Sequence, residues 1–145
     1  MDTVLNAVLE RPRVRTASSL SSTQPWSRCT DAIEAKVVAV DLERHAVEFM
    51  FRFAPGFSSG QHRHTCESHF FVVSGRVVNS TYGIEYGPGD YYYQPDGDTH
   101  DEQFPEGAVV FGSYRGEQDT LVEFFDSDGK LCGDFKVSDF AALMV

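Results

Sequence analysis

Basic residues are scarce in this chain of 145 residues, with 12 lysines and arginines against 22 aspartates and glutamates, and the formal net charge is −10. Three of the basic residues cluster at Arg11, Arg13 and Arg15, so the rest of the chain is more acidic still. A chain with so little positive charge cannot neutralise a phosphate backbone, which argues against nucleic acid as a partner. Anionic membrane surfaces are disfavoured on the same grounds.

Cysteines and long apolar runs are also few. The three cysteines, Cys29, Cys66 and Cys132, are odd in number and irregularly spaced. We therefore expect no disulfide framework and a reducing, cytoplasmic setting. The apolar stretch at residues 3–9 is too short for a signal peptide, and arginines follow it instead of preceding it. No apolar run approaches the roughly 20 residues that a membrane span needs.

One domain accounts for a chain of this length, because it can bury about two-thirds of its unfolded surface around a single core. Residues 1–34 are expected to form an N-terminal arm, with a helix at residues 2–10 and a polar linker at residues 16–23. Residues 35–136 carry a β-rich pattern. Residues 137–145 are expected to form a short C-terminal helical segment.

The β-rich pattern consists of short runs of aromatic and β-branched residues separated by Gly and Pro. Within residues 46–53, Phe49, Phe51 and Phe53 recur with a period of two, which places three rings on one face of a strand. Similar runs occur at residues 36–40, 70–73, 76–78, 91–94, 109–111 and 121–125. Many short strands at even spacing predict an all-β sandwich or closed barrel.

Four of the five histidines fall within residues 62–100, in two blocks with regular glycine spacing. The first block reads Pro-Gly-x5-His-x-His from residue 55, and the second reads Gly-x5-Pro-x-Gly-x2-His from residue 89. Alternate side chains of a strand share a face, so His62 and His64 point the same way, about 7 Å apart. His100 from a neighbouring strand would complete a metal site. Imidazole suits iron, zinc, copper and nickel alike.

These paired blocks resemble the two motifs of the cupin superfamily, the RmlC-like proteins, over roughly residues 46–126. The resemblance implies a single-domain jelly-roll β-barrel that holds a divalent metal ion through His62, His64 and His100, with short helical segments at both ends. Most metal cupins add a glutamate four residues after the second histidine, and that position here is Ser68. Serine is a poor ligand for a divalent metal, so the expected set has three histidines and no carboxylate.

The neighbours of Ser68 are the alternatives for a fourth ligand. Glu67 and His69 have the parity that faces away from the metal, so either would need a β-bulge to turn inward. Ser68 and Glu102 are kept with them as residues that could ligate the ion or support its ligands. Cys66 has the metal-facing parity and as a thiolate would favour zinc, but we interpret it as a small residue between the ligands.

Carboxylates also surround His100 in the sequence. One of them could accept a hydrogen bond from the second ring nitrogen of His100 and so fix its tautomer. Asp96 and Asp98 are interpreted as solvated turn residues, whereas Asp101 and Glu102 remain open for this role.

A narrower resemblance rests on short stretches: His62-Arg63-His64-Thr65-x3-His69, Ser74-Gly75-Arg76, Gly89-Asp90-Tyr91, Pro95-x-Gly97-x2-His100 and the upstream Pro25-Trp26. They look like the cupin branch that contains 2,4'-dihydroxyacetophenone dioxygenase and the acetylacetone-cleaving dioxygenase. The resemblance implies a non-haem Fe(II) enzyme that uses O2 to cleave a carbon–carbon bond beside a carbonyl in an enolisable or hydroxylated ketone. Its partners would be a small-molecule substrate and O2, and zinc, manganese or nickel are the alternatives to Fe(II).

Two other functions stay open on the same scaffold. One is a redox-neutral metal-dependent lyase, isomerase or hydrolase, and the other is a non-catalytic sensor or binding module. The candidates for a pocket lining that would take an aryl or alkyl ketone are Phe51, Phe53, Tyr93, Phe111 and Phe124. We also expect a homodimer, because this fold commonly pairs or exchanges edge strands, and the arm before residue 35 could mediate the contact.

Overall fold

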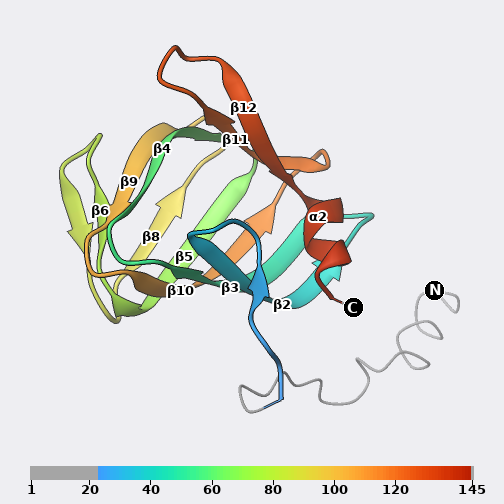
Figure 1. Cartoon of the computed structure of the whole chain (residues 1–145). Coiled ribbons are helices and arrows are strands. Elements are labelled where there is room, and N and C mark those ends of the chain that lie inside the picture. Colours follow the sequence, from blue (N-terminus) through green and yellow to red (C-terminus); the bar gives the residue numbers. More distant parts are fainter. Residues whose placement is uncertain (1–22, 145) are drawn as a thin grey trace, which may run out of the picture.

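Residues 23–144, which the computed structural model describes, form two six-stranded sheets packed face to face, with one short helix near the C-terminus (Figure 1). All strand pairs among these residues are antiparallel. The all-β prediction is therefore confirmed. The predicted helix at residues 2–10 and the linker up to residue 22 lie outside the described residues.

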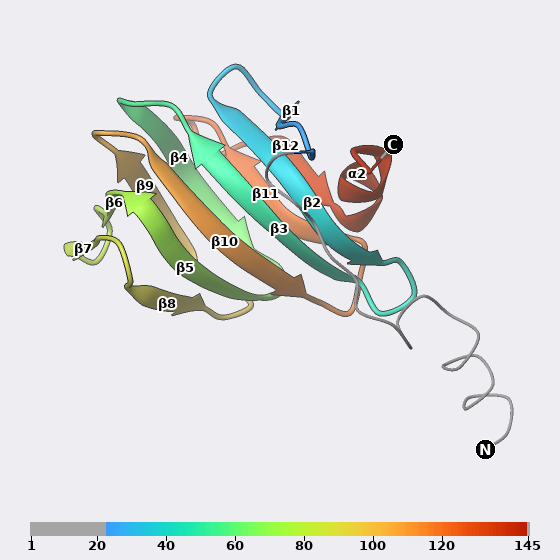
Figure 2. The same ribbon diagram turned by 90° about the horizontal axis from the view of Figure 1, so that it is seen from below.

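The strands of each sheet come from distant parts of the sequence. The first sheet has the order β1 (Ser27–Arg28), β2 (Ile33–Asp41), β3 (Ala46–Phe53), β10 (Ala108–Arg115), β5 (Glu67–Gly75) and β8 (Tyr91–Gln94). The second has the order β12 (Leu131–Lys136), β11 (Thr120–Phe125), β4 (Phe57–His64), β9 (Thr99–Phe104), β6 (Val77–Asn79) and β7 (Ile84–Tyr86). Figure 2 shows the row β2, β3, β10, β5 in front of the second sheet.

The C-terminal helix α2 (Val137–Ala142) is the helical segment that the sequence predicts, and it packs against β2, β3 and β12. Six of the seven runs predicted as strands lie within strands, and the seventh, residues 76–78, overlaps β6. The strands β1, β7 and β12 and the full lengths of β4 and β9 were not predicted. Among residues 23–144, no helix combines the length and apolar character needed to cross a membrane.

Aromatic rings fill the space between the sheets. The period of two along β3 buries Phe49 and Phe51 on the inner face, and Phe53 continues the row. The Phe49 ring lies 4.6 Å from the ring of Tyr114 and 5.3 Å from that of Phe140 on α2, so the helix closes one side of the core. Burial of such large rings supplies much of the hydrophobic stabilisation of a small domain.

Candidate metal centre

Three histidines meet inside the second sheet. β4 and β9 pair so that His62 lies directly opposite His100, and His64 follows on the same inward face of β4. The ring centroids are 4.3 Å apart for His62 and His100, and 5.1 Å apart for His64 and His100. One ring nitrogen from each histidine lies within 4.8 Å of the others, and all three residues are buried. The predicted convergence is confirmed, and the cluster could hold a divalent metal.

Each imidazole is held at Nδ1 by a neighbour, which leaves Nε2 for the interior. The partners are Gly60 O for His62 at 3.0 Å, Ser68 Oγ for His64 at 2.7 Å and Asp98 Oδ2 for His100 at 2.7 Å. A carbonyl or carboxylate oxygen only accepts, so Nδ1 of His62 and of His100 donates and Nε2 carries the lone pair when the ring is neutral. This arrangement orients metal-binding histidines in proteins.

A β-bulge explains the partner of His62. The register between β4 and β9 shifts between Ser58 and Gln61, and Gly60 adopts a φ of +68°. Glycine enters this left-handed region without a Cβ penalty, so a side chain here would be strained. The bulge turns the Gly60 carbonyl toward the His62 ring, and the Ser59 hydroxyl lies 3.1 Å from the same Nδ1.

The unpartnered ring nitrogen of His64 indicates that the three-histidine cluster fits a divalent metal ion. Nε2 of His64 is buried and has no hydrogen-bond partner among residues 23–144. Burial lowers the pKa of His64, and the nearby His62 and His100 lower it further, so the ring stays neutral. When Nδ1 donates to Ser68 Oγ, the lone pair of the ring lies on Nε2. An unpartnered buried nitrogen is costly in a folded protein, and coordination to a cation would satisfy it.

A carboxylate lies beside the cluster, although the group of possible ligands consists of the three expected histidines. It belongs to Glu102, one of the residues kept as a possible fourth ligand or support. Oε1 of the buried Glu102 lies 3.4 Å from Nε2 of His62 and 3.5 Å from Nε2 of His100. Burial alone would raise the pKa of Glu102, but its contacts with the His100 and His62 rings, when these are protonated, outweigh burial, and the net shift is downward. Glu102 is therefore an ionised oxygen donor beside two of the three ligand nitrogens.

Glu67 and His69 do not reach the cluster. The pairing of β5 with β10 runs without a shift from Arg115 opposite Glu67 to Ser113 opposite His69, so no bulge turns either side chain inward. His69 instead contacts Glu67 Oε1 at 2.7 Å and Tyr91 Oη at 2.6 Å on the outer face. Both alternatives for a fourth ligand are wrong, because side-chain parity holds along β5.

Asp98 takes the supporting role that the sequence left to Asp101 or Glu102. Its carboxylate accepts from His100 Nδ1, so its interpretation as a solvated turn residue is wrong. Burial would lower the pKa of His100, but Glu102 and Asp98 outweigh this and the pKa is raised. Asp101 contacts Ser58 Oγ at 3.4 Å and does not contact His100 through a side-chain hydrogen bond.

Cys66 is not part of the cluster among the described residues. Its thiol donates to the carbonyl of Leu121 at 3.4 Å and lies 3.5 Å from Ser68 Oγ. Burial raises the pKa of Cys66 to about 11, so the sulfur remains a protonated thiol at neutral pH. The group of possible ligands contains the three histidines and not this thiol, which agrees with our interpretation of Cys66 as a small residue beside the ligands.

His62 and His64 line a small cavity whose other walls are largely apolar. Its volume is about 40 Å³, and Phe51, Phe53 and Phe124 are among its walls, as predicted. The prediction that Tyr93 and Phe111 line the pocket is wrong, because both rings are exposed on the outer face of the first sheet. Each of the two residues lies at an outward-facing position of its strand. The aromatic character of a residue alone does not show which face of the sheet its side chain is on.

Sequence reasoning missed Gln94 altogether. The buried Gln94 amide donates from Nε2 to His100 Nε2 at 2.8 Å and lies 3.4 Å from Glu102 Oε2. Its Oε1 is buried without a partner among the described residues. Alternation along β8 could have predicted its burial, because Gln94 lies two residues after Tyr92 and so shares the inward face of the strand.

A double-sheet sandwich with a buried three-histidine cluster defines the molecule as a cupin with a site that could hold a divalent metal. The sequence matches the model of the ChrR Cupin-like domain over residues 15–118, and the chain belongs to that family. None of the curated proteins compared matches the sequence.

Solved structures share the fold at low sequence identity. An RmlC-like cupin from Ralstonia eutropha JMP134 superposes with a TM-score of 0.77 and 16% identity, over 88% of this chain and 83% of that one. An acetylacetone dioxygenase from Acinetobacter johnsonii gives 0.74 and 14%, over 89% and 90%. The polyketide cyclase RemF from Streptomyces resistomycificus gives 0.61 and 18%, over 79% and 89%. Enzymes of different names thus share this fold.

Proposed function

We propose that the protein is a non-haem Fe(II)-dependent dioxygenase that cleaves a carbon–carbon bond next to a carbonyl in a small enolisable or hydroxylated ketone. One observation carries this proposal. One ring nitrogen from each of three buried histidines lies within 4.8 Å of the others, and Nε2 of His64 has no partner among the described residues. His62 and His64 also line a small cavity with aromatic walls.

The resemblance of the motifs and the fold shared with an acetylacetone dioxygenase support the same chemistry. A ferrous ion held by three histidines would supply open coordination positions for the oxygens of a ketone and for O2. A dioxygenase of this kind consumes one O2 for each bond cleaved, places both oxygen atoms in the two carbonyl fragments and needs no external reductant.

The chain's own residues have distinct tasks in this proposal. His62, His64 and His100 hold the ion, while Ser68 and Asp98 keep two of the rings in the ligating orientation. The ring of Phe124 lies 5.7 Å from that of His62 and would cover the apolar part of a ketone while excluding water. Glu102 adds negative charge beside the ion, as a fourth ligand or as the acceptor of the proton that an enolisable ketone loses.

The test is an oxygen-electrode assay after anaerobic reconstitution with Fe(II). A panel of β-diketones and hydroxyacetophenones should include at least one compound that supports O2 uptake in a one-to-one ratio with substrate loss. The zinc-loaded protein and the His64→Ala variant are the controls and should be silent. No O2 uptake across the panel, together with tight zinc binding, would reject the dioxygenase.

A redox-neutral enzyme is the second candidate, and the position of Glu102 favours it. A buried carboxylate beside the cluster is suited to moving a proton, which lyases and isomerases require. One solved structure with the same fold carries the name of a polyketide cyclase. Turnover of a ketone under strictly anaerobic conditions would favour this candidate over the dioxygenase.

We also propose that the chain forms a homodimer through the outer face of the first sheet. Phe111, Phe71 and Tyr91 lie side by side across β10, β5 and β8, and all three are exposed. Contiguous exposed aromatics on a soluble domain commonly mark an interface. Light scattering after size exclusion should give twice the chain mass, and Phe71→Glu should give the monomer. Leu42→Glu, at an exposed turn, is the matched control and should stay dimeric.

A further inference from the structure

The cavity at the histidines is too small for the substrates proposed above. Its volume of about 40 Å³ is far below the roughly 300 to 1,000 Å³ of typical ligand pockets. It exceeds the roughly 10 to 15 Å³ that one water molecule needs, so it could hold only very small molecules. A ketone can reach the histidines only if part of the wall moves.

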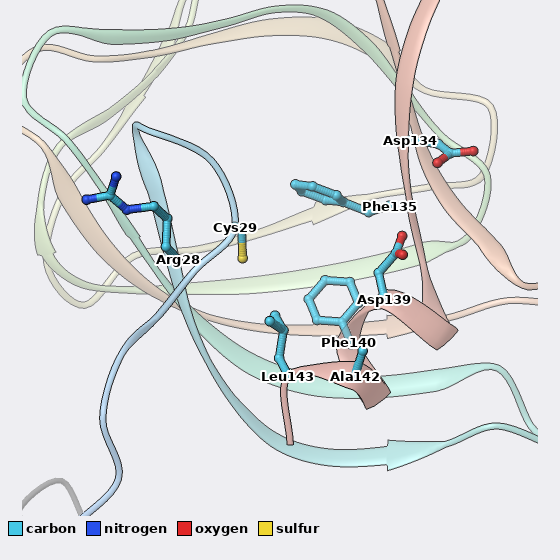
Figure 3. A pocket seen from close by; sticks show the side chains of 8 residues that line it. All are labelled: Arg28, Cys29, Asp134, Phe135, Asp139, Phe140, Ala142 and Leu143. Atoms are coloured by element: carbon cyan, nitrogen blue, oxygen red, sulfur yellow. The ribbon is translucent and has the colours of Figure 1, made fainter. Parts of the chain in front are cut away.

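A larger pocket lies outside this wall. It has a volume of about 350 Å³ and is bounded by the turn after β1, by β12 and by α2. Figure 3 shows Arg28 and Cys29 on one side, Phe140 and Leu143 on the floor, and the ring of Phe135 reaching from β12 toward Cys29. The pocket therefore combines an apolar floor with polar groups at its rim.

Phe135 belongs to the walls of both spaces. Its ring centroid lies 5.0 Å from that of Phe124, and Phe124 in turn lies 5.7 Å from His62. One layer of aromatic side chains thus separates the outer pocket from the ligand histidines. Rotation of the Phe135 ring would join the two spaces.

The setting of Phe135 suits a movable side chain. It is half-buried, and β12 is an edge strand that pairs only with β11 among the described strands, with register shifts at two points. By contrast, the fully buried Phe51 stands on β3, between β2 and β10. Edge elements with few neighbours open at lower cost than central strands do.

We infer that the outer pocket is the entrance to the metal cavity and that the Phe135 ring is its gate, which also limits the size of the ketone admitted. This inference rests on the proposed function only for the identity of the substrate. The entrance itself is a property of the chain and can be tested with any small molecule that binds a metal held by the histidines.

The first test uses Co(II)-loaded protein without O2, so that binding is followed by visible absorption in a stopped-flow instrument. The probes are acetylacetone, a small β-diketone, and azide, which binds metals irrespective of the enzyme's reaction. Phe135→Ala should bind acetylacetone about tenfold faster with unchanged Co(II) affinity. Without the ring, its aromatic contacts no longer have to be broken for entry, and the lower barrier corresponds to roughly a factor of ten in rate. Phe135→Trp should slow acetylacetone more than azide.

The second test leaves Phe135 in place and blocks the outer pocket at Cys29. Cys29 is half-buried in the pocket wall, whereas Cys66 is buried and Cys132 is exposed outside the pocket lining. Phenylmaleimide added at alkaline pH to the Cys132→Ser variant should slow acetylacetone binding at least about tenfold. The matched control is Cys29→Ser protein labelled at Cys132, which should bind at the unmodified rate.

The outcomes separate the entrance from the reaction. Unchanged rates for both probes in Phe135→Ala and in the Cys29-labelled protein would overturn the inference, since entry would then follow another path. Azide binding that follows these predictions, with no acetylacetone binding in any form, would support the entrance and count against the proposed substrate class. Absence of Co(II) binding would overturn both proposals.

Discussion

Asp98→Asn is the most informative single substitution, because it changes one hydrogen bond to a proposed ligand and leaves all three histidines in place. Asp98 Oδ2 accepts from His100 Nδ1 at 2.7 Å, and its side chain is only 14% exposed. Loss of a charged partner to a metal-binding histidine typically costs about 10- to 100-fold in metal affinity, or about 1.4 to 2.7 kcal/mol. We expect a loss in this range for Co(II), measured by competition with a chelator of known affinity.

The pH dependence gives a second, independent readout. The pKa of His100 is raised above the ordinary 6.5, so protons compete with the metal and affinity should fall as the pH falls through this raised value. Asp98 is one of the groups that raise the pKa, so Asp98→Asn should move this fall to lower pH. The two effects can be measured separately. The lost hydrogen bond lowers the Co(II) affinity at high pH, whereas the lower pKa of His100 shifts the midpoint pH of the fall in affinity.

Asp96→Asn is the matched control. Asp96 lies in the same turn and carries the same charge, but it is exposed and does not hydrogen-bond His100 in the described part of the chain. It should leave both the affinity and the midpoint close to those of the parent protein. Equal losses in the two variants would show that only the overall charge of the turn matters, and no loss in either would refute the supporting role of Asp98.

Three further results are expected. His64→Ala removes an inward nitrogen, so equilibrium dialysis should show no tight Co(II) binding while circular dichroism keeps the β spectrum; retained binding would contradict a three-histidine site. Glu102→Gln should weaken Co(II) binding about tenfold, because a buried carboxylate 3.4 Å from His62 Nε2 stabilises a cation there; unchanged affinity with lost turnover would instead assign Glu102 to proton transfer. Ellman titration near pH 8 should detect two thiols in the native protein and three after unfolding, because burial raises the pKa of Cys66 to about 11; three native thiols would contradict its burial.

The strands that build the hydrophobic core were predictable from the sequence. Alternation along β3 gives Phe49 and Phe51 to the interior, and this period of two is a local property that any half-buried strand shows. The strand β12 was not predictable in the same way. Its residues Leu131 to Asp134 are exposed at the sheet edge, so no alternating apolar pattern records its pairing with β11. Phe135, the gate proposed above, lies on this unpredicted strand.

The ligand histidines were predictable because their spacing lies within single strands, whereas the residues that support them depend on pairing between strands. Parity along β5 correctly disfavoured Glu67 and His69. Parity alone could not show that the Gly60 bulge turns a carbonyl toward His62, because a bulge is a relation between β4 and β9. Nor could it show that the Gln94 amide meets His100, since β8 and β9 belong to different sheets.

The strand β9 shows why the sequence named Glu102 only as one of several alternatives. Its residues 99–103 are all polar, so the run does not read as a strand by propensity. Yet it is a strand, and its register places His62 opposite His100. Just before β9, the Asp98 carbonyl accepts a hydrogen bond from the backbone N–H of His64. Inward parity from His100 then runs to Glu102, which is buried although its residue type is usually exposed. The inner face of β9 is polar because His100 and Glu102 lie there beside the cluster. The same polar residues have low strand propensity, so propensity alone does not predict this strand. Such a conflict between local preference and structure is expected at a functional site.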